Sequence, residues 1–378
     1  MFESSWSIVS AFVVFLAGIF VVTKFSSNFR LKKKRGLLLY VWHTLFCIAY
    51  LLYALANGAD SLMYYSVALE GRFNPSFGTS FVITITSLLV QGLGLGIIGC
   101  FLFFNILGTI GLLAFDGALR QATQYKSKFL KRLATLIIFL PSVSFWSSAI
   151  GKDAISFLAM GLALWAALQL NQRLLLMILA IFLMLVVRPH MAGMMIIALS
   201  VSIVFDKNTS IVKRFVLGIV ALIGVAAMVP FALEYAGVSD PSSSEALVDY
   251  VENRQSYNMD GGGGVDIANM SLPMQLFTYM FRPIIFEARS ITALAAAIDN
   301  LILLYLFIVG IYALIIKKSQ SFTENRKFMW VYVAIAWVVL SMTTANLGIA
   351  IRQKWMFAPI LIFLLISLVG KNRSYSQR

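Results

Sequence analysis

The sequence predicts an all-α fold, a polytopic bundle of about 11 transmembrane helices with a long loop on one face. Of the 378 residues, 60% are hydrophobic and only 12% are charged. The mean hydropathy is +0.87, whereas soluble domains are nearer half apolar and a quarter charged. Apolar runs long enough to cross a bilayer recur along the chain, and the alternation typical of a membrane β-barrel is absent.

The predicted spans follow from these runs in chain order. The first stays a span because MFESSW lacks the basic region of a secretory signal. The run 80–114 is too long for one perpendicular helix, so we expect a span to residue 101 followed by an in-plane or re-entrant piece, NILGTIGLLAFDGALR. The predicted spans are residues 6–23, 37–56, 80–114, 133–150, 154–171, 174–188, 191–205, 215–233, 291–316, 328–346 and 355–370.

Basic residues predict the orientation of the bundle. Most of the 30 Lys and Arg residues gather in segments that alternate onto one side, such as KFSSNFRLKKKR and the segment 120–132. By the positive-inside rule, that side is the cytoplasm, the N-terminus lies outside and the C-terminus lies inside. Residues 1–378 then form a single membrane domain with a first outer loop at 57–79 and a long outer loop at 234–289. The long loop holds half of the 16 acidic residues, and loops of this length are usually functional.

Several classes of function are excluded or disfavoured. The net charge of +14 reflects the basic loops, so no nucleic-acid partner is expected. Both cysteines lie in apolar runs, which argues against a disulfide framework or thiol–metal site. No phosphate-binding glycine loop, dinucleotide fingerprint or zinc-ligand spacing is present, so neither a cofactor nor a metal is expected.

Eight basic residues lie on the predicted outer side, and four of them lie at or just beneath the ends of predicted spans. Cations retained there, against the positive-inside bias, indicate an anionic ligand, because guanidinium and ammonium groups match phosphate oxygens. The candidates for phosphate binding are Lys152 in SSAIGKDAIS, Arg188 in VVRPHMAG, Arg282 in FRP and Arg352 in NLGIAIRQKW. We expect these four side chains to share one cavity.

Each candidate also has a purely structural interpretation. Lys152 and Asp153 could close a helical turn, Arg188 and His190 could be a packed pair, and Asp60 could cap a helix. Arg352 could belong to a generic polar turn, and Arg254 could be an ordinary loop charge. On a helix, Asp60 and Tyr64 would share a face. The functional interpretation rests on several improbable charges falling on the same side.

Short motifs in these segments resemble a known enzyme superfamily. GADSLMYY resembles the first outer loop of the membrane-embedded GT-C glycosyltransferases, and LPSVSFWSSAIGKDAISFLAMGLAL resembles a hairpin of the same superfamily. VVRPHMAG, FRPIIFEA and ANLGIAIRQKWMFAPILIFL resemble segments of bacterial Wzy-type repeat-unit polymerases. The match covers residues 57–195 and 275–365. The chain departs from the pattern in having a single loop acid, Asp60, and Lys152-Asp153 where many relatives carry Ser/Thr-Asp or Glu.

The resemblance implies a GT-C-like fold and transfer of a sugar or oligosaccharide from a polyprenyl-(di)phosphate carrier, such as undecaprenyl diphosphate. The acceptor would be a glycan, as in O-antigen or exopolysaccharide polymerases, at the outer face of a bacterial cytoplasmic membrane. Membrane lipids and other polysaccharide-assembly proteins are the expected further partners. The site residues would be Asp60 or His190 as the base, Lys152, Arg188, Arg282 and Arg352 on phosphate, Asp153 orienting Lys152, Tyr64 on the acceptor, and Arg254 and Glu287 on a closing loop.

Two other classes of function remain open. A transporter or flippase for a lipid-linked glycan would use the same cations to bind without reacting. An accessory subunit of a polysaccharide synthase would use the outer charges as interface pairs. No internal repeat is visible, which disfavours the transporter.

Overall fold

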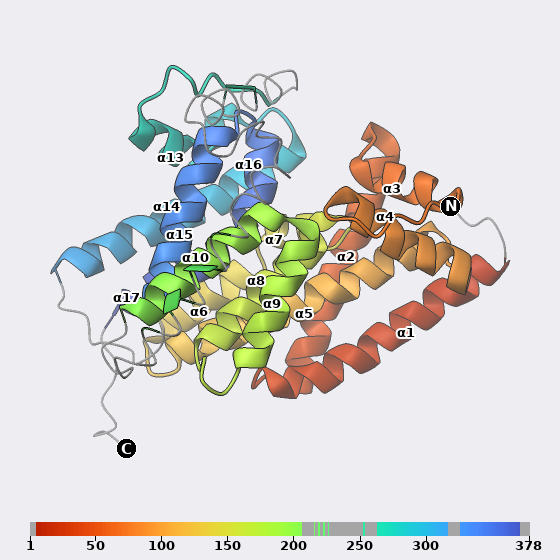
Figure 1. Ribbon diagram of the computed structural model, residues 1–378, viewed down its shortest axis with the longest axis horizontal. Coiled ribbons are helices and arrows are strands. Elements are labelled where there is room, and N and C mark those ends of the chain that lie inside the picture. Colours follow the sequence, from red (N-terminus) through yellow and green to blue (C-terminus); the bar gives the residue numbers. More distant parts are fainter. Residues whose placement is uncertain are drawn as a thin grey trace. The chain divides into compact units, whose positions relative to one another are not determined.

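The computed structural model describes residues 5–205, 263–316 and 326–370, together with a few isolated positions between 215 and 253. Every regular element in this part of the chain is helical (Figure 1). The chain divides into two compact units. The first holds residues 1–166 and 173–188 of the described segments, and the second holds residues 167–172 and 189–370.

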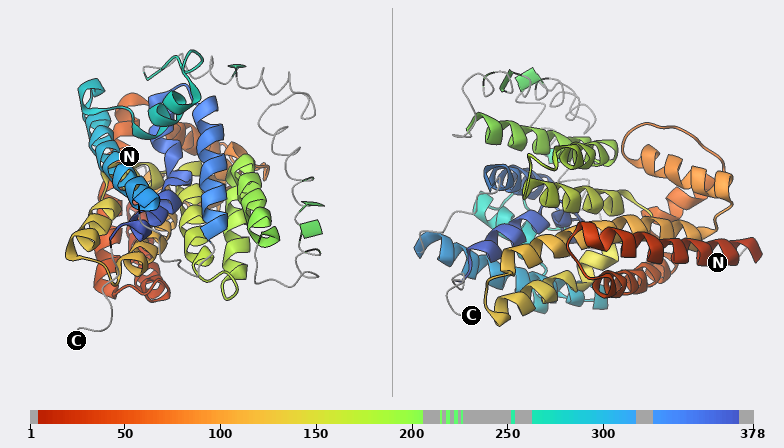
Figure 2. Two further views of the ribbon diagram at one scale, coloured as in Figure 1. Left: turned by 90° about the vertical axis from the view of Figure 1, so that its left-hand side faces the viewer. Right: turned by 90° about the horizontal axis from the view of Figure 1, so that it is seen from below.

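The first unit is built around one long buried helix. It contains α1 (Ser5–Asn28), α2 (Lys33–Asn57), α3 (Asp60–Leu69), α4 (Thr79–Ser87), a π-helical turn (Leu88–Gly92), α5 (Ile97–Thr123), α6 (Lys128–Ile138), α7 (Pro141–Ser147), α8 (Lys152–Ala167) and α9 (Leu174–Val187). Helix α5 packs against α1, α2, α6 and α7. Figures 1 and 2 show α1 alongside α5.

Small residues let the backbones approach α5 closely, as in other membrane bundles. A Cβ added at Gly111 would lie 2.7 Å from the carbonyl oxygen of Phe157, and one at Gly117 would lie 2.6 Å from that of Phe29. These two glycines of α5 therefore let α8 and the chain at the end of α1 approach to backbone distance.

The second unit contains α10 (Pro189–Val204), α13 (Leu272–Phe281), a 3₁₀ turn (Ile285–Glu287), α14 (Ile291–Ile316), α15 (Arg326–Thr343), α16 (Leu347–Gln353), a second 3₁₀ turn (Lys354–Met356) and α17 (Ala358–Leu368). Helix α15 packs on α10, α13 and α17, while α14 packs on α17. Trp337 of α15 donates a hydrogen bond to the carbonyl oxygen of Leu276 at 3.0 Å, which fastens α13 to this helix.

The structure confirms the all-helical prediction, and its long apolar helices support a membrane protein. In the described segments six helical stretches are long and apolar enough to cross a bilayer: α1, α2, α5, the stretch Lys128–Ser147 that contains α6 and α7, α14 and α15. The pair Leu347–Met356 and Ala358–Leu368 would make a seventh span, bent by 66°. Helices α9 and α10, with 14 and 16 residues, extend only about 21 and 24 Å, less than the roughly 30 Å of a bilayer core. The predicted span 215–233 lies almost wholly outside the described residues.

The predicted division of 80–114 at residue 101 is wrong. The break falls at Leu93–Gly96, and α5 then runs without interruption to Thr123. Gly94 adopts a φ of 65°, and the indole of Trp6 donates to the carbonyl oxygen of Leu93 at 3.1 Å. This contact with α1 satisfies a carbonyl that the break leaves without a helical partner. NILGTIGLLAFDGALR is consequently part of a buried helix.

Candidate functional site

The opening of α8 carries the two charges of SSAIGKDAIS. Residues 148–151 form bends, and the helix begins at Lys152. Asp153 lies in the first turn of α8, where a negative charge is favourable beside the positive end of the helix dipole. The charges therefore lie at a break between α7 and α8. Gly151 lies outside the left-handed region, so this break does not depend on a positive φ.

Asp153 forms an ion pair with Arg188, the residue that caps the C-terminus of α9. Nη2 of Arg188 lies 2.5 Å from Oδ1 of Asp153, and the two side chains are only 9% and 18% exposed. A pair this buried is stable only with both partners present, because an uncompensated buried charge costs several kcal/mol. The pair therefore fixes the start of α8 against the end of α9.

Lys152, the first residue of α8, is the third charged residue of this group and contacts α4. Its Nζ donates to Oγ1 of Thr79, at the start of α4, at 3.1 Å. The backbone N–H of Gly78 donates to the carbonyl oxygen of Val186 at 2.8 Å, so α4 is also held to the end of α9. Three of the predicted site residues, Lys152, Asp153 and Arg188, thus lie close together, and the group contains two cations and one carboxylate. Asp153 accepts a hydrogen bond from Arg188, and its predicted role of orienting Lys152 stays a prediction.

Asp60 and Tyr64 lie in α3 in different surroundings. Asp60 is the exposed first residue of the helix, whereas Tyr64 is 4% exposed within an apolar cluster that includes Tyr50 and Phe101. His190 is half-buried in the first turn of α10, two residues after Arg188. Their roles as base and acceptor contact stay predictions. Arg254 lies outside the described residues.

Arg282 and Glu287 pair with each other in the second unit. Nε and Nη2 of Arg282 lie 2.8 and 2.5 Å from Oε1 of Glu287, and the N–H of Ile284 donates to Oε2 at 3.0 Å. The hydrogen bond from Arg282 is the main cause that lowers the pKa of the Glu287 carboxyl below its ordinary value. Glu287, predicted to close a loop over substrate, is here the partner that neutralises Arg282.

A buried polar group lies beside the Arg282 segment. Lys354 is fully buried and bonds to Oδ1 of Asn300 on α14, and Nδ2 of Asn300 donates to the carbonyl oxygen of Pro283 at 3.0 Å. The neighbouring Asp299 is also fully buried. Sequence reasoning missed Asp299 and Asn300, although a carboxylate and an amide inside the apolar run AAAIDNLILL are the signal that marks them.

The four cations predicted to share one cavity are divided between the units. Lys152 and Arg188 belong to the first, and Arg282 and Arg352 belong to the second. Their convergence on one ligand stays a prediction. Within the described ranges no group of three or more His, Cys, Asp or Glu residues could hold a metal ion.

A second group missed in the sequence surrounds His43 in α2. The imidazole is fully buried, with Nδ1 2.5 Å from Oδ1 of Asn105 and Nε2 2.9 Å from Oγ of Ser147. Thr109 lies 3.2 Å from the same Nδ1. The Nδ1–H tautomer lets the ring donate to Asn105 and accept at Nε2, so the group ties α2, α5 and α7 together by hydrogen bonds.

Comparison with known proteins adds no relative. No family model matches the chain, and no curated protein and no solved structure is significantly similar to it.

Proposed function

We propose that the protein is an integral-membrane glycosyltransferase that takes a sugar or oligosaccharide from a polyprenyl-phosphate or -diphosphate carrier at the outer face of the membrane. The observation that supports this most is the group formed by Lys152, Asp153 and Arg188. Its two cations exceed its one carboxylate, and helix ends hold them in a mostly buried place. Such a place favours a phosphate group, because charge–charge attraction is stronger away from bulk water.

The reaction has two requirements that this chemistry meets. A bond forms between the acceptor hydroxyl oxygen and the anomeric carbon, while the bond from that carbon to the carrier phosphate oxygen breaks. Negative charge develops on the departing phosphate, and preorganised Lys152 and Arg188 stabilise it. The acceptor proton passes to a general base, for which Asp60 is the first candidate and His190 the second. Asp60 has the exposure that a base needs to reach a soluble acceptor.

The second unit contributes differently under this proposal. Arg282 already has a bidentate carboxylate partner, so its attraction for phosphate is reduced unless Glu287 moves away. Two other cations of that unit could contact the phosphate under this proposal. They are Arg352, in the last turn of α16, and the buried Lys354.

Replacing Arg188 by Ala tests the proposal. We expect the rate of sugar transfer to fall about 10²–10³-fold, by analogy with the loss of one oxyanion-stabilising donor. The assay is transfer of radiolabelled sugar from synthetic undecaprenyl-phosphate- and undecaprenyl-diphosphate-linked donors to a glycan acceptor in proteoliposomes. Arg72→Ala is the matched control, because this arginine pairs at the surface with Glu70 and its side chain is 71% exposed.

A further variant separates catalysis from folding. Arg188→Ala breaks the ion pair with Asp153, whereas Lys152→Gln keeps the Asp153–Arg188 pair and removes the second cation, the ammonium group that bonds to Thr79. We expect Lys152→Gln to insert normally and still lose at least about tenfold in rate. Undiminished transfer by inserted Lys152→Gln and Arg188→Ala proteins would remove the proposed role of this group.

A transporter for a lipid-linked glycan is the second candidate, and the second unit favours it. Interrupted helices with buried charges are typical of substrate sites in transporters, and the 66° bend between α16 and α17 lies beside buried Lys354. Asp60→Asn distinguishes the two functions, because transport needs no base. Loss of sugar transfer in this variant supports the enzyme, and retained movement of the lipid-linked glycan without any transfer activity supports the transporter.

A further inference from the structure

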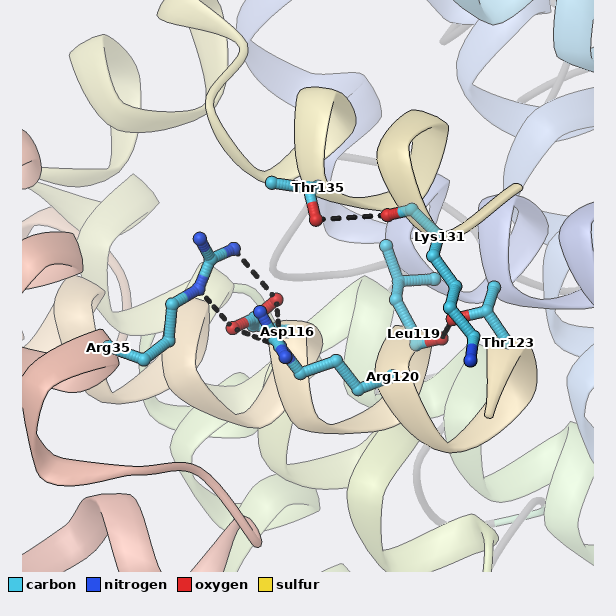
Figure 3. A network of polar contacts seen from close by, with 7 residues as sticks. All are labelled: Arg35, Asp116, Leu119, Arg120, Thr123, Lys131 and Thr135. Carbon is cyan, nitrogen blue, oxygen red and sulfur yellow. Dashed lines mark hydrogen bonds and ion pairs between the residues drawn. The ribbon is translucent and has the colours of Figure 1, made fainter. Parts of the chain in front are cut away.

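Asp116, near the C-terminal end of α5, organises a basic cluster at the predicted cytoplasmic side of the first unit. Nε and Nη2 of Arg35 lie 2.9 and 3.2 Å from the two oxygens of Asp116, and Nε of Arg120 lies 3.2 Å from Oδ2. The carboxylate is 1% exposed. Figure 3 shows it between the two guanidinium groups. One buried carboxylate thus fixes two arginines and is itself neutralised by them.

A cavity of 450 Å³ opens beside this cluster. Its lining includes the cationic residues Arg30, Arg120 and Lys131, together with Asp116, Gln121 and Gln124. That volume is within the usual range for ligand sites, about 300–1,000 Å³. The cavity is therefore lined by three cations and one carboxylate, and that carboxylate already accepts two hydrogen bonds from Arg35.

The cations of the cavity keep hydrogen-bonding capacity for a ligand. Arg120 uses Nε toward Asp116, which leaves its two Nη groups for another acceptor. In the part of the chain that the structure describes, neither Arg30 nor Lys131 forms an ion pair. In contrast, the hydroxyls of Thr123 and Thr135 donate to the carbonyl oxygens of Leu119 and Lys131 at 2.8 and 2.9 Å. The free donors are thus the charged groups.

The fold presents these cations from three separate segments, the turn after α1 and the helices α5 and α6. Arg30 adopts a left-handed φ of 57° where α1 ends, and the N–H groups of Arg30 and Leu31 bond back to Ser27 and Ser26 at 3.0 and 2.9 Å. Arg120 comes from α5, and Lys131 reaches from α6 toward α5 (Figure 3). Convergence from three segments of the chain distinguishes this cavity from a run of basic residues on one solvated face.

This cavity is distinct from the group at Lys152. Trp165 of α8 packs on Gly117, one residue from Asp116, and it follows Lys152 by thirteen residues, roughly 20 Å along the helix at 1.5 Å per residue. The two groups therefore lie near opposite ends of α8.

We infer that this cavity is a binding site for a phosphate group, carried either by a lipid headgroup or by a soluble phosphate compound. Arg120 and Lys131 would contact the phosphate oxygens, and Arg30 would close the site from the end of α1. Arg35 acts as a positioning residue, since it holds Asp116 and through it Arg120. The inference does not depend on the reaction proposed for the Lys152 group.

Binding measurements on the purified full-length protein test the site. One arm is equilibrium binding of radiolabelled pyrophosphate in detergent. The other is retention of phosphatidylglycerol by protein taken from nanodiscs that contain both phosphatidylglycerol and phosphatidylcholine, followed by native mass spectrometry. We expect Lys131→Ala and Arg30→Ala each to weaken binding about tenfold, the equivalent of about 1.4 kcal/mol, in the arm that shows binding. Lys131→Arg should retain it.

Lys128→Ala is the matched control, because it removes the same charge from an exposed position on the same helix. Lys128 does not line the cavity. Pyrophosphate binding that only the cavity variants lose supports a soluble ligand, and phosphatidylglycerol retention lost in the same way supports a lipid headgroup. Absence of binding in both arms overturns the inference, and so does an equal loss in Lys128→Ala and Lys131→Ala. The variants replace exposed side chains without ion pairs among the described residues, so folding is not expected to change, and melting temperatures check this.

Discussion

At the scale of single residues, guanidinium–carboxylate pairs fix the ends of helices. Arg188 and Asp153 connect α9 with α8, Arg35 and Asp116 connect α2 with α5, and Arg282 and Glu287 close the segment between α13 and α14. The first two pairs are nearly buried, and the third is about a quarter exposed. Their contributions to stability should differ accordingly, because solvent screens the exposed pair.

The Arg282–Glu287 pair predicts a dependence of stability on pH. The lowered pKa of Glu287 means that its contribution is fully present above the ordinary value of 4.5 and is lost as the pH falls through the lower folded-state pKa. We expect Glu287→Gln to reduce the free energy of unfolding by about 1 kcal/mol or less at pH 6. The difference in melting temperature between wild type and variant should shrink as the pH is lowered below 4.5.

Glu70→Gln is the control for this measurement, because the Glu70–Arg72 pair is 55% and 71% exposed. It should change the melting temperature little at either pH. A difference for Glu287→Gln that stays constant with pH would contradict the role assigned to the pair.

The sequence identified many of these residues but not their partners. Several of them stand out in the sequence as charges in apolar surroundings, namely Lys152, Asp153, Arg188, Arg282 and Glu287. Asp153 and Arg188 are 35 positions apart, and Arg35 and Asp116 are 81 apart. Pairing over such separations depends on how the helices pack, which periodicity and charge counts do not contain. For this reason the sequence predicts only that the basic segments 24–35 and 120–132 lie on the cytoplasmic side, and not that they form a cavity.

At the scale of elements, α5 is the helix on which the first unit depends. Its buried glycines allow close backbone contact, and its Asn105 and Asp116 bond to residues of α2. Gly108 shows the tightest of these contacts, since a Cβ there would overlap the carbonyl oxygen of Ser147 and lie 2.8 Å from Cε1 of His43. Backbone on the neighbouring helix cannot move aside as a flexible side chain can.

We therefore expect Gly108→Ala to destabilise the protein by about 1–3 kcal/mol or more, the cost of overfilling a packed interior. The measurement is the melting temperature of purified protein in detergent. Gly92→Ala is the matched control, because a Cβ at Gly92 meets no atom within 4 Å. Equal melting temperatures for the two variants would show that α5 and α7 are less closely packed than described.

Sequence rules located the long helices well and the broken ones poorly. The predicted spans 6–23, 37–56, 291–316 and 328–346 correspond closely to α1, α2, α14 and α15. The cut within 80–114 was misplaced because a length rule cannot anticipate the contact of Trp6 with Leu93. Apolar runs likewise do not show that α9 and α10 are too short to cross a bilayer by themselves.

At the scale of the whole molecule, the described chain forms two compact units, each with its own polar groups. The basic cluster of the first unit joins Arg30, Arg35, Arg120 and Lys131. These four residues come from two separate basic segments that the positive-inside rule assigns to one side. Arg30, Arg120 and Lys131 line the cavity, and Arg35 bonds to Asp116 beside it.

Accessibility of introduced cysteines tests the orientation. Both natural cysteines are fully buried, so they should give little background. We expect Asn74→Cys to react with a membrane-impermeant maleimide in intact cells and Lys33→Cys to react only after permeabilisation. Both positions are exposed in the structure. The reverse pattern would invert the predicted topology and move the proposed transfer site to the cytoplasmic face.

Composition and charge distribution predicted the class of the molecule, because the bilayer imposes them on any chain that spans it. They did not predict the division into two units, which follows from contacts between helices far apart in the chain. The GT-C resemblance remains a hypothesis about function for the same reason: it rests on short motifs, and motifs do not specify how two units combine.

The bonds between α2 and α5 also have a consequence for biogenesis. Asn105 and Asp116 would be costly in lipid if α5 entered the bilayer alone. Chains are synthesised from the N-terminus, so Arg35 and His43 of α2 are already at the membrane when α5 leaves the ribosome. Helix α5 can then enter the bilayer beside α2, whose side chains bond to its polar groups. The order of the two helices in the sequence thus favours their correct assembly.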